Sequence, residues 1–285
     1  MKYLLILTLA ILATIKASVQ GEFSKKMVKN TADVLIYNFL VFLFSGIIFS
    51  YRLVSSDIEV WVFASLGAFF TVLFQLLYTK ALSIGTVSLT VMIVNLGLVI
   101  NVLFSYFVYN EALSWVRGVG IILTIITFVV CVDFKNPKKA EKKWLIYALG
   151  AMLATTTASG IQQAFVKSAY GAQNAAYVSC VYLLGALFIM LSYVPLKRKG
   201  DGKTFRMNRR VIILALASGV CLGLYKFVST YSLSVVDGTF FFPARAGTSI
   251  VFSTLSGVFL FKDKLSPKQK LSVALGCISI VLMNY

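Results

Sequence analysis

The sequence has 285 residues, of which 59% are hydrophobic and only 13% are charged, and its mean hydropathy is +0.87. Soluble domains carry about 25% charged residues, so this composition excludes a soluble globular protein and indicates one that crosses a bilayer several times. A net charge of +17 could suit nucleic-acid binding, but the basic residues lie in short breaks between apolar runs, where they act as topology signals.

Ten apolar segments, each long enough to cross a bilayer, follow one another along the chain. The expected helices cover residues 3–23, 32–51, 58–79, 87–109, 115–133, 144–167, 174–195, 210–232, 238–261 and 268–285. Pro137, Pro195 and Pro267 fall in or beside the polar breaks, as residues that stop helices should. The predicted fold is an all-α membrane protein with ten transmembrane helices.

The first segment could pass for a secretory signal peptide, but an internal repeat argues that it is a genuine helix. The stretch LATIKASVQGEFSKK at 12–26 recurs as LATTTASGIQQAFVKS at 153–168. Further matches join Gly85-Thr86 to Gly238-Thr239, and NEALSW at 110–115 to KDKLSP at 262–267. The chain is thus predicted to consist of two similar five-helix units, residues 1–136 and 137–285. Because five is odd, the second unit is inverted, and inverted repeats are typical of transporters that bind substrate near the midplane.

The distribution of basic residues predicts the orientation. Most of the 27 Lys and Arg residues lie in the loops after odd-numbered helices, whereas the even-numbered loops hold only Arg52, Arg117 and Lys167. The positive-inside rule places the odd-numbered loops in the cytoplasm and both termini outside.

The stretch from Tyr78 to Gly120 resembles the EamA-type repeat of the drug/metabolite transporter superfamily. The residues that carry the resemblance are Ala81, a helix rich in small residues, Glu111, Leu113, Ser114 and Gly118. The second half keeps Asp263, Leu265 and Ser266, but has Lys270 where the glycine is expected. The resemblance implies ten helices, a central pocket and alternating access, and leaves the substrate open. Glu111 and Ser114 also have a structural interpretation, since both can stabilise the start of the fifth helix.

Three cations lie within the apolar spans: Lys16, Lys226 and Arg245. No carboxylate lies as deep, so these side chains should face the protein interior, where a bound anion is their natural counter-ion. The planar fork of Arg245 suits a carboxylate or phosphate. Alternatives remain open, because the lysines could reach an interface and Arg245 could satisfy a carbonyl freed by Pro243.

Neutral polar residues at helical spacing complete the candidate site. The predicted contacts are Gln75, Asn95, Gln162 and Tyr225, with Lys16, Lys226 and Arg245 as the cations. The polar stripes are Thr71, Gln75 and Tyr78; Thr155, Ser159 and Gln162; Ser88 and Asn95; and Arg245, Ser249 and Ser253. The alternative for each stripe is hydrogen bonding between helices.

The predicted function is that of a secondary transporter for a small anionic or zwitterionic metabolite in the cytoplasmic membrane. The expected partners are that metabolite and the lipid bilayer, without nucleic acid, and the oligomeric state is left open. The chain has no histidine, four cysteines without a C-x-x-C pair, and no Walker A sequence, so no metal, cofactor or direct use of ATP is expected. One alternative is export of cationic drugs by proton exchange, for which Glu22 is the candidate carboxylate. Another is a membrane enzyme or a structural subunit, which the missing histidine and the scattered acids disfavour.

Overall fold

The computed structural model describes residues 2–28, 31–85, 87–131, 139–198, 209–246, 248, 252 and 267–283, and the regular structure among them is helical. The elements are α1 (Lys2–Lys26), α2 (Thr31–Ile47), the 3₁₀ helix η1 (Ser50–Ser55), α3 (Ile58–Ile84), α4 (Val87–Tyr109), α5 (Trp115–Cys131), α6 (Lys139–Lys167), α7 (Asn174–Arg198), α8 (Arg209–Val235) and α10 (Pro267–Met283). Residues 238–246, between α8 and α10, are also helical, and most of the remaining predicted helix to residue 261 lies outside the described residues. The predicted all-helical class is therefore confirmed.

The second helix ends at Ile47, four residues before the predicted end. The serines that follow bond to nearby carbonyls: Ser50 Oγ donates to Ile47 O at 2.9 Å, and Ser56 Oγ donates to Leu53 O at 2.7 Å. Serine hydroxyls compete with the helical pattern in this way. The chain tightens into η1 before α3 begins.

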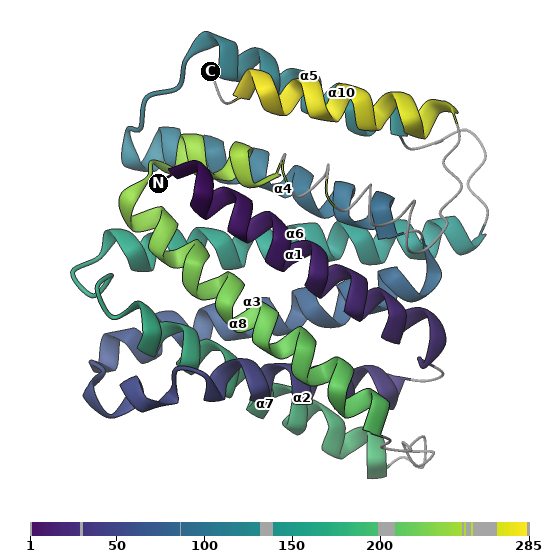
Figure 1. Cartoon of the computed structure of the whole chain (residues 1–285), viewed down its shortest axis with the longest axis vertical. Coiled ribbons are helices and arrows are strands. Elements are labelled where there is room, and N and C mark those ends of the chain that lie inside the picture. The colour runs from purple at the N-terminus through teal and green to yellow at the C-terminus, as the bar shows by residue number, and fades with distance from the viewer. Residues whose placement is uncertain are drawn as a thin grey trace.

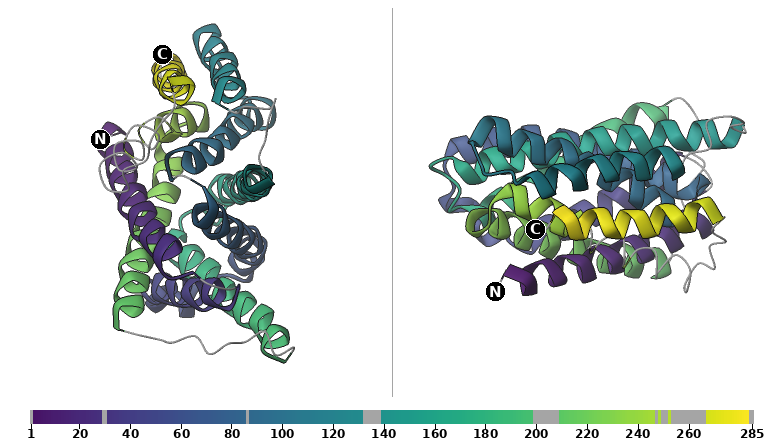
Figure 2. Two further views of the ribbon diagram at one scale, coloured as in Figure 1. Left: turned by 90° about the vertical axis from the view of Figure 1, so that its right-hand side faces the viewer. Right: turned by 90° about the horizontal axis from the view of Figure 1, so that it is seen from above.

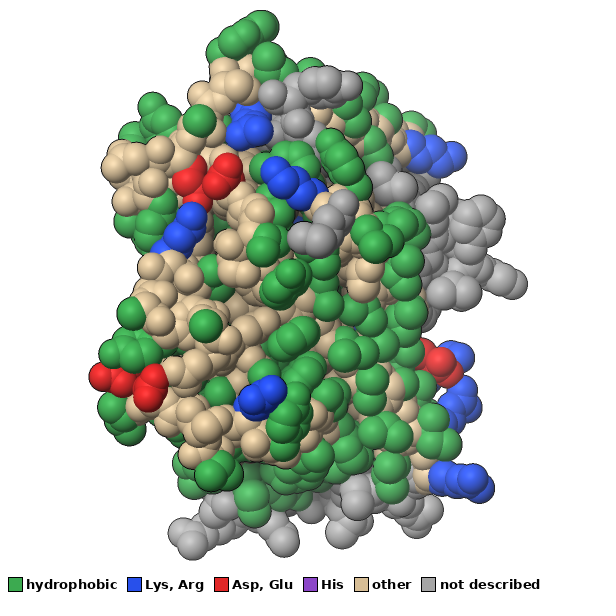
Figure 3. All heavy atoms as spheres, turned by 60° about the vertical axis from the view of Figure 1, so that its left-hand side comes forward, with side chains coloured by type: hydrophobic (Ala, Val, Ile, Leu, Met, Phe, Trp, Pro, Cys, Tyr) green, Lys and Arg blue, Asp and Glu red, His purple; other side chains and the backbone are tan. Residues whose placement is uncertain are grey.

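Length and composition identify this fold as a multi-pass membrane protein. Within the described part of the chain, five helices are long and apolar enough to cross a bilayer: α1, α3, Lys142–Lys167 in α6, Asn174–Tyr193 in α7, and α8. Exposed apolar side chains form stripes at helical spacing, with Leu4, Leu7, Ile11 and Ile15 on α1 and Ile58, Val62, Leu66, Phe69 and Leu73 on α3. Figure 3 shows hydrophobic side chains over much of the visible face, with separate Lys and Arg side chains between them and at its right-hand edge. The stripes face outward, as lipid-contacting surfaces do, because lipid tails solvate apolar side chains.

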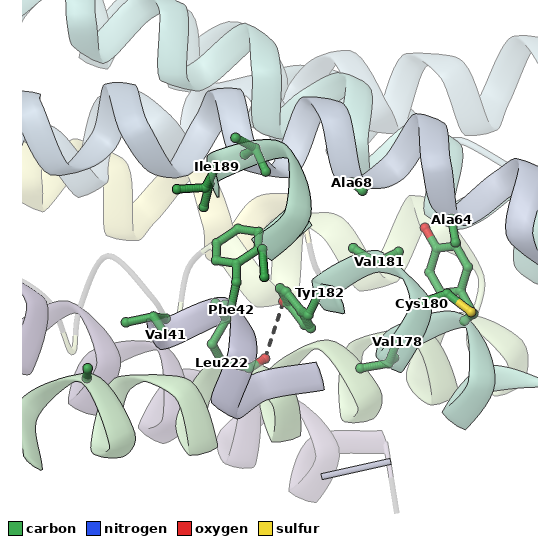
Figure 4. Close-up of a cluster of buried hydrophobic side chains, with 14 of the residues drawn as sticks. Val41, Phe42, Ala64, Ala68, Val178, Cys180, Val181, Tyr182, Ile189 and Leu222 are labelled. Carbon is green, nitrogen blue, oxygen red and sulfur yellow. Dashed lines mark hydrogen bonds between the residues drawn. The ribbon is translucent and has the colours of Figure 1, made fainter. Parts of the chain in front are cut away.

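The helices pair across the two halves of the sequence. Helix α1 packs on α8, α3 on α6, α2 on α7 and α5 on α10, and both chain ends lie at the same end of the bundle (Figures 1 and 2). The largest buried apolar cluster of the described residues joins α2, α3, α7 and α8. There Phe42 packs edge-on against Tyr182 with ring centroids 5.2 Å apart, and Val41 and Leu222 lie beside them (Figure 4).

Helices α2 and α8 approach closely because Gly219 has no side chain. Ser45 Oγ donates to Gly219 O at 2.8 Å, and a Cβ placed on Gly219 would lie 2.8 Å from the backbone oxygen of Val41. We expect Gly219→Ala to lower the free energy of unfolding by about 1–3 kcal/mol, since backbone atoms must shift. Thermal unfolding in detergent measures the change. Gly118→Ala is the control, since a Cβ there meets no atom of the described residues within 4 Å. Equal stability of the two variants would contradict the prediction.

Candidate functional site

A cavity of about 120 Å³ lies inside the bundle, among helices from both halves of the chain. Its walls come from α1, α3, α4, α6, α8 and the helical segment 238–246. The lining residues are Ala13, Thr14, Lys16, Ala17, Phe74, Tyr78, Val91, Val94, Asn95, Leu98, Thr155, Leu222, Tyr225 and Arg245. The cavity thus has an apolar wall with a few polar groups, as small-molecule sites usually do.

Lys16 enters the cavity from α1 and is held there by α3. Its ammonium donates to Gln75 Oε1 at 3.0 Å and lies 5.0 Å from the ring centroid of Tyr78 and 5.3 Å from that of Phe74. Gln75 is held in turn, because its Nε2 donates to Asn38 Oδ1 at 3.0 Å. All these polar groups are buried. The amide network therefore positions the charge of Lys16 without neutralising it.

Arg245 enters the same cavity from the segment 238–246. Its Nη1 donates to Ser229 Oγ at 3.4 Å, and its guanidinium lies 5.3 to 6.0 Å from the ring centroids of Tyr225, Phe241 and Phe242. Among the described residues, no carboxylate forms an ion pair with Arg245 or Lys16. The cavity therefore holds two basic side chains for which the described lining supplies no acidic partner.

Lys226 lies beside the cavity rather than in its lining. Its ammonium donates to Gln162 Oε1 at 2.7 Å, and Gln162 Nε2 donates to Ser229 Oγ at 3.1 Å and to Thr230 Oγ1 at 2.9 Å. Ser229 thereby connects this network to Arg245. Of the predicted site residues, Lys16, Asn95, Tyr225 and Arg245 line the cavity, whereas Gln75, Gln162 and Lys226 form the supporting networks.

The networks of the two halves contain matching contacts. Gln20 Nε2 donates to Thr79 Oγ1 at 2.6 Å, as Gln162 donates to Thr230. Phe23 stacks on Tyr37 with centroids 3.7 Å apart, and Phe165 stacks on Tyr177 at 4.1 Å. Gln20 and Phe23 are residues that the sequence repeat aligns with Gln162 and Phe165.

Sequence reasoning did not single out several residues of the site and its support. Among them are Thr14 of the lining, Gln20, Asn38, Phe74 and Thr79, and the hydroxyls of Ser229 and Thr230. The repeat contained a signal for Gln20, whose amide recurs in the second half. The sequence showed Asn38 only as a single amide in an apolar helix. Its hydrogen bonds are to Gln75 and Thr79 of another helix, which the sequence could not show.

The other predicted polar stripes divide into several groups. Tyr78 and Thr155 line the cavity, while Thr71 and Ser159 are buried outside its lining. The side chain of Ser88 and the residues Ser249 and Ser253 lie outside the described part of the chain.

Glu111 and Ser114 occupy the connection between α4 and α5. Ser114 Oγ accepts the backbone N–H of Arg117 at 3.4 Å, as a residue capping the start of α5 does. Glu111 instead accepts the backbone N–H of Thr239 at 2.9 Å and pairs with Lys167 at 3.1 Å. Its carboxylate therefore stabilises the start of the segment 238–246 and joins the two halves of the chain.

A helical multi-pass membrane protein built around a charged internal cavity has the architecture of a membrane transport protein. Residues 4–132 match the EamA-like transporter family, and the predicted resemblance is confirmed over these residues. The family indicates a membrane transporter of the drug/metabolite transporter type.

Two further comparisons concern whole proteins. The sequence matches no curated protein. A solved structure titled "Crystal structure of protein" is 16% identical, covers 99% of this chain and 95% of its own, and superposes with a TM-score of 0.68. That chain shares the fold.

Proposed function

We propose that this transporter is a secondary carrier of a small anionic or zwitterionic metabolite across the cytoplasmic membrane. The observation that carries the proposal is the pair Lys16 and Arg245, which come from opposite halves of the chain and line one cavity without a carboxylate in the described lining. Buried cations are costly unless they are paired, so an anionic guest stabilises the cavity. Arg245 would bind the anion through its fork, and Asn95, Thr155 and Tyr225 would supply neutral contacts.

The helix packing supports an inverted repeat of residues 1–136 and 137–285. Exchanging the first five helices with the last five converts the α1–α8 contact into the α6–α3 contact, and it maps α2–α7 and α5–α10 onto themselves. The cavity lies between the two repeats, since Thr14 and Thr155, which the repeat aligns with each other, both line it. Carriers built from inverted repeats bind substrate in this position.

Alternating access would follow from rocking one half against the other. At one end of the bundle the halves are joined by the ion pair of Glu111 with Lys167. At the other end Glu22 pairs with Arg210 at 2.5 Å. One of these links would have to open in each access state, while the cavity between them stays in place.

No residue of the described lining favours export of cations by proton exchange. Glu22, the carboxylate considered for that role, pairs with Arg210 and Lys26 and is not part of the lining. A cationic substrate would meet Lys16 and Arg245 instead of an acid.

A matched pair of variants on α1 tests the proposal. Lys16→Met removes a charge from the cavity, and Lys26→Met removes an exposed one at the end of the same helix. We expect small carboxylates or phosphate to raise the melting temperature of wild type and Lys26→Met, whereas Lys16→Met loses about tenfold or more in anion affinity. Thermal shift in detergent and anion uptake into liposomes measure the effect. Stabilisation by cationic compounds, with a normal response of Lys16→Met, would contradict an anion carrier.

A further inference from the structure

The charged side chains that line the cavity are all basic among the described residues. The lining contains two cations, Lys16 and Arg245, and no Asp or Glu among the described residues. Both cations are at least nine-tenths buried, with exposed fractions of 8% each. An ammonium group on a ligand would therefore enter a site that repels it, because like charges interact strongly where water is scarce.

Aromatic rings could in principle receive a ligand ammonium by cation–π contact, but those in the cavity already face protein cations. Phe74 and Tyr78 lie beside the ammonium of Lys16, at 5.3 and 5.0 Å from their centroids. Tyr225 lies 6.0 Å from the guanidinium of Arg245. Among the described residues, these three rings are the aromatic side chains of the lining. A ligand ammonium placed on one of these rings would lie close to the cation of Lys16 or Arg245. The repulsion between the two cations would offset the favourable energy of the cation–π contact.

The remaining polar groups of the lining are neutral. Asn95 Nδ2 donates to Val91 O at 2.9 Å, and the Thr14 hydroxyl donates to Ala10 O at 2.7 Å. Amide and hydroxyl groups can bind a hydroxyl or carbonyl of a ligand. They carry no charge that would offset the repulsion between a ligand ammonium and the two cations.

The volume of the cavity favours a small ligand. At about 120 Å³ the cavity is of the same order as a cavity of roughly 150 Å³ that holds benzene, so it suits a ligand with a short carbon body. Such a ligand has room for one or two anionic groups.

We infer that the site selects compact anions that lack an ammonium group, so that 2-hydroxy acids, related short organic acids or phosphate are bound and the corresponding amino acids are rejected. The inference rests on the proposed anion carrier and narrows its substrate class, since zwitterions are removed from it. The charge of the lining, more than its shape, decides the selection, because a hydroxyl and an ammonium are nearly equal in size.

Matched ligand pairs test this selection. The pairs are lactate and alanine, glycerate and serine, and malate and aspartate, with inorganic phosphate as a further anion. We expect at least one anion of this panel to bind wild type, and each amino acid to bind at least about tenfold more weakly than its hydroxy acid. Thermal shift and competition for uptake into liposomes measure the affinities.

A variant that adds one carboxylate to the cavity sharpens the test. Asn95→Asp is nearly isosteric and should reduce the preference for the hydroxy acid by at least about tenfold, since the new acid pairs with a ligand ammonium. Asn110→Asp is the matched control, because Asn110 is exposed in the α4–α5 connection with φ of 52°, a conformation that Asp also tolerates. That control should keep the wild-type preference.

The outcomes separate the inference from the proposed function. If alanine, serine or aspartate binds wild type as tightly as its hydroxy acid, the inference is overturned while an anion or zwitterion carrier survives. If none of the anions binds and cationic compounds do, the proposed function fails and the inference fails with it. An unchanged preference in Asn95→Asp would show that the charge of the lining does not decide the selection, which also overturns the inference.

Discussion

Arg245→Gln is expected to abolish anion transport while leaving the protein folded. The guanidinium lines the cavity, and its one hydrogen bond to a described side chain is the 3.4 Å contact with Ser229. No described carboxylate loses its partner when the charge is removed, so the variant should be at least as stable as wild type. Binding should weaken about a hundredfold, because a buried charge-assisted contact is lost. Liposome uptake and thermal unfolding measure the two effects.

Arg245→Lys and Arg117→Gln complete this experiment. Arg245→Lys keeps the charge but loses the planar fork, so we expect an intermediate loss of roughly tenfold. Arg117 bonds to Ala112 O and Thr239 Oγ1 at one end of the bundle, away from the lining, and its variant should transport normally. Uptake by Arg245→Gln at the wild-type rate would remove this residue from the substrate site.

Gln162→Leu is expected to be the most destabilising of the variants. Gln162 Oε1 accepts a hydrogen bond from the ammonium of Lys226 at 2.7 Å, and Gln162 Nε2 donates to the hydroxyls of Ser229 and Thr230. The substitution leaves a buried ammonium without its acceptor among the described residues. We expect the free energy of unfolding to fall by about 3 kcal/mol, which is typical for a buried charge that loses its partner.

A double-mutant cycle separates this cause from lost packing. Adding Lys226→Met to Gln162→Leu removes both partners, and it should recover most of the lost stability because the orphaned ammonium is gone. Denaturant unfolding in detergent of the two single variants and the double variant measures the coupling. Gln173→Leu, at the link to Asp57 near the bundle end, is a control that should cost about 1 kcal/mol or less. The explanation would be refuted if the double variant lost as much free energy of unfolding as the two single variants lose together.

The EamA resemblance and the helices were predictable because they depend on local properties of the chain. Hydropathy and segment length predicted the helical class. The repeat of residues 12–26 at 153–168 contains Gln20 and Phe23, whose contacts recur in the second half, although sequence reasoning did not single these residues out. The early end of α2 at Ile47 was missed, since serine hydroxyls rather than hydropathy end that helix.

The composition of the candidate site was only partly predictable. The sequence showed three cations in apolar spans, and all three are buried as expected. It could not show that Lys16 and Arg245 share one cavity while Lys226 is held beside it by Gln162. Nor could it show that Asn38 and Gln75 form the support of Lys16.

The sequence by itself therefore determined the membrane class, the helical character of the chain and the set of buried charges, because each follows from residue type and spacing along the chain. Only the tertiary structure decided which charges face each other. Lys16 and Gln75 are 59 residues apart and Lys226 and Gln162 are 64 apart, and such contacts depend on how each helix is rotated about its axis. That rotation is set by packing between helices, such as the close approach of α2 and α8 at Gly219, and not by the residues of any one helix.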